Sequence, residues 1–154
     1  MASSSKTLRS ITLKEPLVVN PQMSIFEATK LMAAKNIDSV IVVGLTGNPD
    51  TPPSLRKPQI HGIVTVKDVS SRVIAKGLDP ARVTVAQVMT SPIQSVSIDT
   101  TLYKVVMMMN QNNFRQVPVV EGDKVVGLVT ATMLNTSIIN DIVDDIRLLT
   151  TIFR

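Results

Sequence analysis

The chain has 154 residues, of which 44% are hydrophobic and 18% are charged. This composition is typical of a globular protein, because so many apolar residues can offset the entropy lost on ordering. No apolar run approaches the roughly 18 residues that span a bilayer, and residues 1–6 lack the apolar segment of a secretory signal. The net charge of +4 would attract an anionic small ligand. Scattered basic residues and only 3% aromatic residues disfavour a nucleic-acid partner.

The sequence contains no cysteine and a single histidine, His61. This excludes disulfides, thiolate metal sites, cysteine nucleophiles and a two-histidine metal cage, and it disfavours a Ser-His-Asp triad. We therefore expect no metal site, no cofactor and no catalytic residues, and we expect the cytoplasm as the compartment. His61 itself is predicted to be a residue at a strand edge.

The chain repeats itself. Positions 7–43 align with positions 84–120 at an offset of 77, and this alignment pairs Asn36 with Asn113. After Val43 the offset drops to 65, which aligns 62–65 with 127–130 and marks a 12-residue insertion in the first copy. Prolines and glycines crowd positions 44–58, so the first copy is expected to carry an exposed inserted loop, bounded at 44–61.

Each copy has the same predicted order of elements. In the first copy a short helical segment over 8–13, which we call the lead-in, comes first. It is followed by a helix that begins with the capping box Ser24–Glu27 and ends at Asn36 in a left-handed C-cap. Two strands at 40–43 and 60–65 follow, and a second helix runs from near Asp68 to Gly77. The second copy repeats the pattern with the lead-in 85–90, a helix ending at Asn113, strands at 117–120 and 125–130, and a tight hairpin turn at 121–124.

A single copy of about 60 residues buries too little surface to be stable alone. The predicted fold is therefore α/β (α+β), with two β-α-β-β-α repeats packed sheet to sheet about a pseudo-twofold axis. The first repeat spans 1–78 and contains the inserted loop, and the second spans 79–154 and includes a C-terminal helix.

Duplicated motifs in this order resemble a tandem CBS-domain pair, also called a Bateman module. The resemblance covers positions 7 to about 140 and is carried by Gly62-Ile63-Val64-Thr65-Val66-Lys67-Asp68, Gly127-Leu128-Val129-Thr130, the lead-ins 8–11 and 85–92, and the segment 115–120. It implies a regulatory module that binds AMP, ADP, ATP or S-adenosylmethionine. It also implies a homodimer in the form of a flat disc of four repeats.

The residues around Asp68 have a chemistry that suits a nucleotide. An ionised carboxylate can accept hydrogen bonds from both ribose hydroxyls, and Thr65 can reach the ribose or a phosphate oxygen. Lys67 adds a mobile positive charge, the start of the helix favours anions, and Ile63 offers an apolar wall for the base. The spacing of Thr65 and Asp68 also fits a capping box, so a purely structural role remains open.

By analogy with the family, the base and phosphates would also meet the other repeat, at Thr90, Ile93, Gln94, Phe114 and Arg115. Arg115 is the predicted phosphate ligand, since its guanidinium can pair bidentately, although a surface ion pair is the alternative.

The second copy departs from the motif, which predicts a degenerate second site at Asp38, Leu128, Thr130 and Met133. Methionine cannot accept hydrogen bonds from two ribose hydroxyls, and we expect it to act as a hydrophobic plug instead. Asp38, at the position that matches Arg115, would repel phosphates.

Two functions therefore remain. One is an adenine-nucleotide sensor without catalytic activity that signals to an unidentified effector protein by a conformational or dimer change. The other is a dimerisation or scaffold module with a decayed ligand site.

Overall fold

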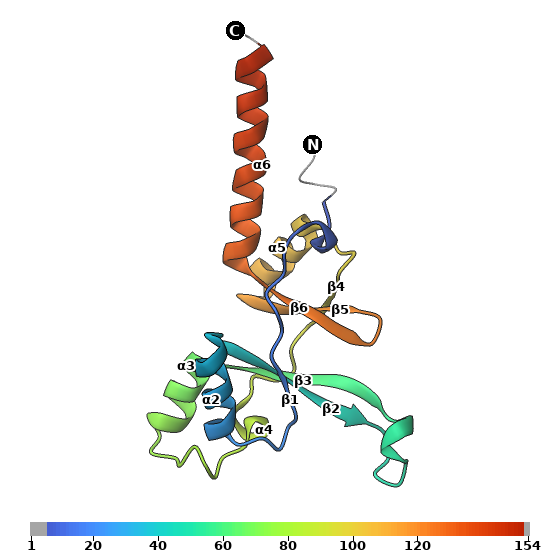
Figure 1. Cartoon of the computed structure of the whole chain (residues 1–154), viewed down its shortest axis with the longest axis vertical. Coiled ribbons are helices and arrows are strands. Elements are labelled where there is room, and N and C mark those ends of the chain that lie inside the picture. The colour runs from blue at the N-terminus through green and yellow to red at the C-terminus, as the bar shows by residue number, and fades with distance from the viewer. Residues whose placement is uncertain (1–5, 153–154) are drawn as a thin grey trace. The chain divides into compact units, whose positions relative to one another are not determined.

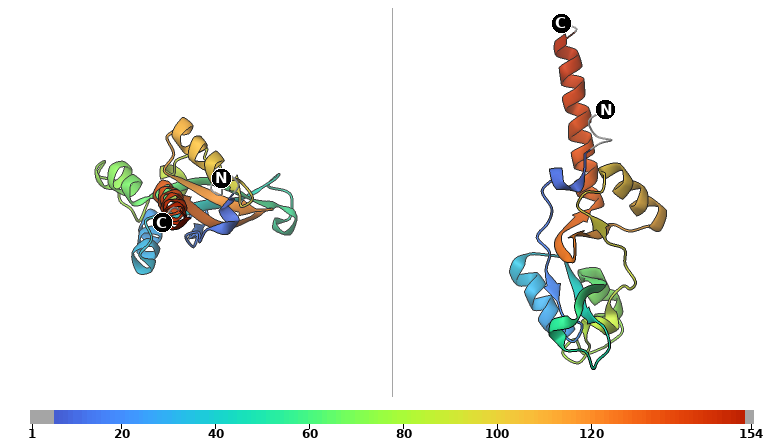
Figure 2. Two further views of the ribbon diagram at one scale, coloured as in Figure 1. Left: turned by 90° about the horizontal axis from the view of Figure 1, so that it is seen from above. Right: turned by 90° about the vertical axis from the view of Figure 1, so that its right-hand side faces the viewer.

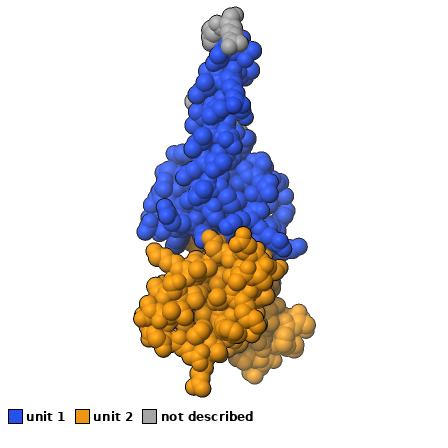
Figure 3. Space-filling model, turned by 60° about the vertical axis from the view of Figure 1, so that its left-hand side comes forward, with its two compact units in different colours: residues 1–15, 95–154 blue, residues 16–94 orange. Residues whose placement is uncertain are grey.

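The computed structural model describes residues 6–152 and divides the chain into two compact units (Figure 3). Unit 2 is Pro16–Gln94, and unit 1 combines Met1–Glu15 with Ser95–Arg154. Each unit contains one three-stranded sheet with helices, which confirms the predicted mixed α and β class. Sheet-to-sheet packing of the two repeats stays a prediction.

Unit 2 is built around a sheet in the order β1-β2-β3, in which β1 runs parallel and β3 antiparallel to β2 (Figure 1). Its elements are β1 (Val18–Val19), α2 (Ile25–Lys35), β2 (Ser39–Thr46), η2 (Pro53–Leu55), β3 (Lys57–Thr65), α3 (Val66–Val69), the π-helical turn η3 (Ser70–Ile74) and α4 (Val85–Val88).

The core of unit 2 lies on one face of this sheet. Val40, Val42 and Val64 share that face because alternate residues of a strand point the same way, and they pack with Ile25 of α2. Ile41 and Ile63 are paired on the opposite face and are also buried.

Unit 1 repeats this plan with a sheet in the order β4-β5-β6, again with one parallel and one antiparallel pairing. Its elements are η1 (Leu8–Ser10), β4 (Val96–Ser97), α5 (Leu102–Asn112), β5 (Gln116–Glu121), β6 (Lys124–Thr130) and α6 (Ala131–Ile152). The helix α6 extends well beyond α5 (Figures 1 and 2). Within residues 6–152, we find no helix with both the length and the apolar character needed to cross a bilayer.

Local details confirm the internal repeat. Asn36 ends α2 at φ 53°, and Asn113 ends α5 at φ 55°, so both adopt the left-handed C-cap that the sequence predicts. The hairpin turn between β5 and β6 is also present, with Gly122 at φ 61°. Both hairpins are irregular at equivalent places, after Val42 and after Val119. The same local signals therefore produce the same backbone twice.

The lead-ins are exchanged between the repeats. The lead-in that precedes the first repeat belongs to unit 1, where Leu8 is buried in the core and Lys14 pairs with Leu128. The lead-in that precedes the second repeat belongs to unit 2, where Thr90 pairs with Ile63. The sequence boundary between 78 and 79 therefore does not coincide with the compact units. The boundary at 78/79 follows the linear order of the repeats along the chain. In the folded protein, however, each lead-in packs in the unit that contains the sheet of the other repeat.

The inserted loop is shorter than the predicted 44–61. Strands β2 and β3 continue into it, because Gly44, Leu45 and Thr46 pair with Gln59, Pro58 and Lys57. A proline is tolerated there since β3 is an edge strand, where one missing N–H need not break a ladder. The remaining connection, 47–56, contains η2 and is braced by Arg56, whose Nε donates to the Thr51 carbonyl at 2.7 Å.

Candidate functional site

The junction between β3 and α3 has the geometry of a complete capping box. The Thr65 hydroxyl accepts a hydrogen bond from the Asp68 N–H at 3.2 Å, and the Asp68 Oδ2 accepts one from the Thr65 N–H at 2.9 Å. The Asp68 side chain is only 15% exposed. The capping role left open by the sequence is therefore present, and a ligand at this carboxylate would have to share it with the helix cap.

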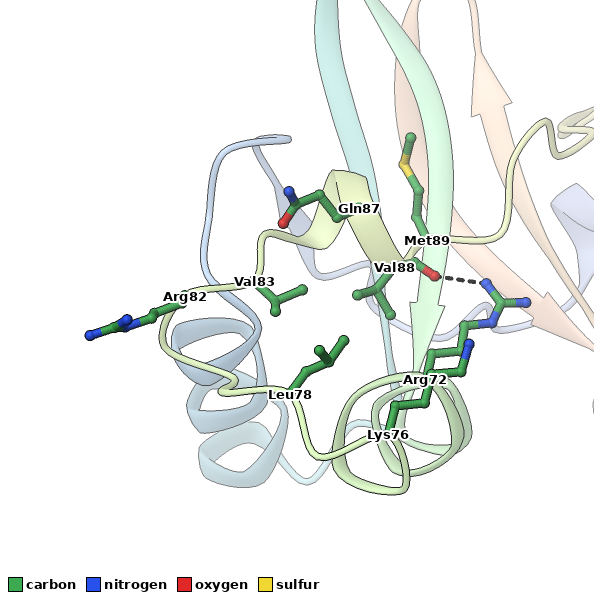
Figure 4. Close-up of a pocket in the computed structure, with 8 residues that line it drawn as sticks. All are labelled: Arg72, Lys76, Leu78, Arg82, Val83, Gln87, Val88 and Met89. Atoms are coloured by element: carbon green, nitrogen blue, oxygen red, sulfur yellow. Dashed lines mark hydrogen bonds between the residues drawn. The ribbon is translucent and has the colours of Figure 1, made fainter.

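Arg72 is a further residue of this junction that the sequence reasoning missed. Its Nε lies 3.7 Å from Asp68 Oδ1, too far for a hydrogen bond but within reach of an ion pair. Its guanidinium also donates to the Val88 carbonyl of α4 at 2.7 Å (Figure 4). Arg72 thus connects the Asp68 carboxylate to the lead-in that ends at Thr90. The four-residue spacing from Asp68 is the sequence signal that could have identified it.

A pocket of about 550 Å³ opens beside this contact on unit 2, where η3 and α4 approach one another. Arg72 and Lys76 lie together on one side of it, and Arg82 points away (Figure 4). This pocket is not formed by Thr65, Lys67 or Asp68, so it is separate from the predicted ribose contacts.

The other predicted residues of unit 2 fall into two groups. Ile63 and Thr90 are held together by a pair of backbone hydrogen bonds of 3.1 and 2.9 Å. Ile63 is 8% exposed, which leaves only its edge to contact a base. Lys67 and Gln94 are exposed and Ile93 is half-buried.

Close approach of the lead-in to β3 depends on Gly62. A Cβ added at Gly62 would lie 2.6 Å from the Thr90 carbonyl oxygen, so the pairing of Ile63 with Thr90 requires glycine there. In unit 1, a Cβ at Gly127 would likewise lie 2.6 Å from Leu13 Cβ. The glycine of the duplicated motif therefore permits the lead-in to pack against the strand in both units.

Phe114 and Arg115 belong to unit 1. Phe114 packs against the core of that unit, whereas Arg115 is exposed. The Arg115 carbonyl accepts from the Ala131 N–H at 2.9 Å, as the Asp38 carbonyl in unit 2 accepts from the Val66 N–H at 3.0 Å. These equivalent contacts hold the start of the following helix in each repeat. Participation of Phe114 and Arg115 in a ligand site stays a prediction.

The equivalent junction of unit 1 lacks half of the capping box. Thr130 still accepts from the Met133 N–H at 3.2 Å, but methionine has no oxygen with which to accept the Thr130 N–H. Met133 instead packs against the core of unit 1, beside the buried Leu134. Leu128 is buried as well. These residues supply no carboxylate at the position that Asp68 occupies in unit 2.

The first junction can therefore offer a carboxylate, a hydroxyl and an exposed amine within four residues. Asp68 Oδ1 receives no hydrogen bond among residues 6–152, so it can accept one from a ligand. Across the same residues, no group of three or more histidine, aspartate or glutamate side chains is arranged to hold a metal ion.

Comparison with known proteins identifies the family. The family model for the CBS domain matches residues 8–75 and 85–139, so the chain belongs to the CBS-domain family, with two copies in tandem. CBS-domain proteins are usually regulatory or signal-transduction modules rather than enzymes.

Relatives and solved structures agree with this assignment. The chain is 31% identical over 132 residues to the CBS domain-containing protein CBSCBSPB2 of Arabidopsis thaliana. The aligned region covers 86% of this chain and 23% of that protein. It thus spans less than a quarter of that relative. A crystal structure of an uncharacterized conserved protein from Pyrococcus horikoshii is 25% identical, with a TM-score of 0.68 and coverage of 87% and 92%. The hexameric CBS-CP12 protein from bloom-forming cyanobacteria is 23% identical, with a TM-score of 0.69 and coverage of 86% and 71%, and it shares the fold.

Proposed function

We propose that this CBS pair is a regulatory module without catalytic activity that binds one adenine nucleotide per chain, of the AMP, ADP or ATP type. S-adenosylmethionine is a further adenosyl candidate. The single observation that carries the proposal is the junction of β3 and α3, where Thr65, Lys67 and Asp68 present complementary polar groups.

The chemistry of a ribose fits Asp68 even though this residue also caps α3. A carboxylate has about four lone-pair sites, and the cap uses one of them, on Oδ2. The vicinal ribose hydroxyls are both donors, so they could bind to Oδ1 and to the remaining position on Oδ2. Such hydrogen bonds are charge-assisted and therefore stronger than those between neutral groups. The exposed Lys67 supports the proposal as a mobile partner for phosphate.

The proposed stoichiometry is one site per chain because the two junctions differ. Met133, at the position in unit 1 that matches Asp68, packs against the core of that unit. In the proposed site, Ile63 would offer an apolar wall for the base and Arg115 would pair with a phosphate. Thr90, Ile93, Gln94 and Phe114 would complete the contacts to the base and phosphates.

The proposed output is a conformational or dimer change that an effector protein detects. Arg72 supports this step, since it connects Asp68 to the Val88 carbonyl and so to the segment that leads out of unit 2. A ribose that donates hydrogen bonds to the Asp68 carboxylate would weaken the ion pair between this carboxylate and Arg72. The proposed state is a homodimer, and the proposed compartment is the cytoplasm, consistent with a chain that has no cysteine for disulfides.

A second candidate is a dimerisation or scaffold module with a decayed ligand site. The observation that favours it is that Asp68 already has a structural role, with its cap hydrogen bonds and its ion pair to Arg72. Under this function Asp68 is retained for the fold alone.

Calorimetric titration of the chain with AMP, ATP and S-adenosylmethionine separates the two functions. If the chain is a sensor, at least one of these three ligands should bind saturably with a stoichiometry of about one ligand per chain. The same ligand should raise the melting temperature, because a ligand that binds only the folded state stabilises it. Two equivalent sites per chain would contradict the proposed asymmetry between Asp68 and Met133. A dimer that binds none of these ligands would support the scaffold.

A further inference from the structure

The C-terminal helix α6 has a long section that nothing in its own unit covers. Ala131, Met133 and Leu134 attach its first turn to the core of unit 1, and Lys6 pairs with Asp141 at 2.6 Å. Every residue from Ile142 to Ile152 is exposed. The ribbon of α6 extends well beyond the other helices of unit 1 (Figures 1 and 2). This section therefore forms a helix without packing from unit 1.

The composition of this section makes a solitary helix unfavourable. Six of its eleven residues are β-branched, which are weaker helix formers because their side chains lose rotamer freedom against the preceding turn. In proteins most of the stability of a helix comes from packing of its apolar face and not from intrinsic propensity. Its helical state thus calls for an apolar face that packs against something.

Such a face is present and has a regular spacing. Ile139, Ile142, Ile146 and Leu149 follow one another at intervals of three, four and three residues, and their side chains are 51–58% exposed. These intervals are those of the a and d positions of a coiled coil, with Ile139 and Ile146 at a and Ile142 and Leu149 at d. Contiguous exposed apolar surface on a protein marks a site of interaction with another molecule, such as a protein or a membrane.

From this pattern we infer that α6 pairs in parallel with α6 of a second copy of this chain, through Ile139, Ile142, Ile146 and Leu149. Isoleucine at a with leucine at d favours two parallel strands, and Ile142 is the one departure from that rule. This surface lies outside the proposed nucleotide site and is independent of ligand binding.

Charge supports a second copy as the occupant. In a parallel pair each stripe residue meets its own counterpart, so the same apolar sequence forms both sides of the seam. Asp144 falls on the outer face, and Asp145, which flanks the seam, would face Thr150 of the other helix and not another acid. The section from 142 to 152 carries two aspartates and one arginine, a balance that disfavours an anionic lipid surface.

Matched charge variants in the full chain test the seam. Ile146→Asp buries a carboxylate in the proposed contact, whereas Thr151→Asp adds the same charge to the outer face of the same helix. Both positions are exposed in the single chain, so circular dichroism and thermal melting are expected to show intact units. By light scattering and sedimentation, the dimer dissociation constant is expected to rise at least about tenfold for Ile146→Asp and to stay within about twofold for Thr151→Asp. A parent chain that is monomeric at about 100 μM, or an Ile146→Asp chain that dimerises as tightly as the parent, overturns the inference.

Single cysteines test the parallel arrangement, since the chain has no cysteine of its own. Leu149→Cys places two thiols face to face only in a parallel pair, and Thr151→Cys places them on outer faces. Mild oxidation is expected to link Leu149→Cys dimers covalently and to leave Thr151→Cys largely unlinked. Equal linkage of the two variants, or none at Leu149→Cys, overturns the parallel seam.

Discussion

Replacing Asp68 by asparagine separates the two roles of this residue. The amide oxygen of asparagine can still accept the Thr65 N–H, whereas the negative charge is lost. The chain itself contains this arrangement, because Gln87 Oε1 accepts the Thr84 N–H at 2.9 Å in the capping box of α4. We therefore expect the free energy of unfolding of Asp68→Asn to lie within about 0.5 kcal/mol of that of the parent.

Nucleotide affinity should respond differently. In Asp68→Asn one acceptor oxygen remains and the charge-assisted hydrogen bonds to the ribose disappear, which should weaken AMP binding roughly tenfold or more. Asp68→Ala should weaken it by about 1.5–3 kcal/mol, roughly 10- to 150-fold. The measurement is calorimetric titration with AMP.

Asp68→Ala also removes one of the two hydrogen bonds of the capping box, and its cost in stability follows from the contacts. The Thr65 hydroxyl can still accept the backbone N–H of residue 68, so the loss is the hydrogen bond from the Thr65 N–H, which contributes about 1–2 kcal/mol. The pairing with Arg72 adds little, since that side chain is 42% exposed and the atoms are 3.7 Å apart. A fall in melting temperature of about 2–8 °C is expected, measured by calorimetry or dye fluorescence.

Gln87→Ala is the matched control. It removes the equivalent acceptor from the α4 cap and should lower stability by a similar amount without changing the affinity for AMP. If Asp68→Asn binds AMP as tightly as the parent while Asp68→Ala only melts earlier, Asp68 is a helix cap alone, and the sensor loses its main support.

Three further substitutions test the packing. Gly62→Ala should lower the free energy of unfolding, measured in urea, by about 2–3 kcal/mol, because the new Cβ would collide with the Thr90 carbonyl oxygen. An unfolding midpoint equal to that of the parent would contradict this close approach. Asn113→Ala should lower the free energy of unfolding by about 1 kcal/mol, whereas Asn113→Gly should leave it unchanged, since glycine and asparagine adopt φ 55° more readily than alanine; equal melting of the two variants would refute this reason. The hydrogen bond from Arg9 lowers the pKa of Asp99, so this contact stabilises the fold above about pH 4 and is lost as the pH falls through the lowered pKa. Arg9→Met should raise the pKa of Asp99 back towards its ordinary value in an NMR titration, and no upward change would show that the contact is absent in solution.

The repeat and its local signals could be predicted from the sequence because they depend on neighbouring residues. Asn36 and Asn113 end their helices where the pattern predicts, since a left-handed C-cap is specified by one residue. The Thr65–Asp68 junction could be anticipated for the same reason, as three residues of spacing fix a capping box. Residue spacing alone could not decide between a cap and a ligand site, because both require the same side chains.

Contacts between distant segments were decided only by the tertiary structure. Strands β2 and β3 extend into a stretch rich in proline and glycine because each supplies the other's hydrogen-bond partners, which overrides the local turn signals. Assignment of each lead-in to the opposite repeat follows from the burial of Leu8 in one core and of Val85 in the other. The apolar stripe of α6 is visible as spacing in the sequence, but its exposure follows from where the packing of unit 1 ends, since Leu134 is the last buried residue of α6 and every residue from Ile142 to Ile152 is exposed. Periodicity specifies which side of a helix is apolar, and only the packed chain determines whether that side is covered.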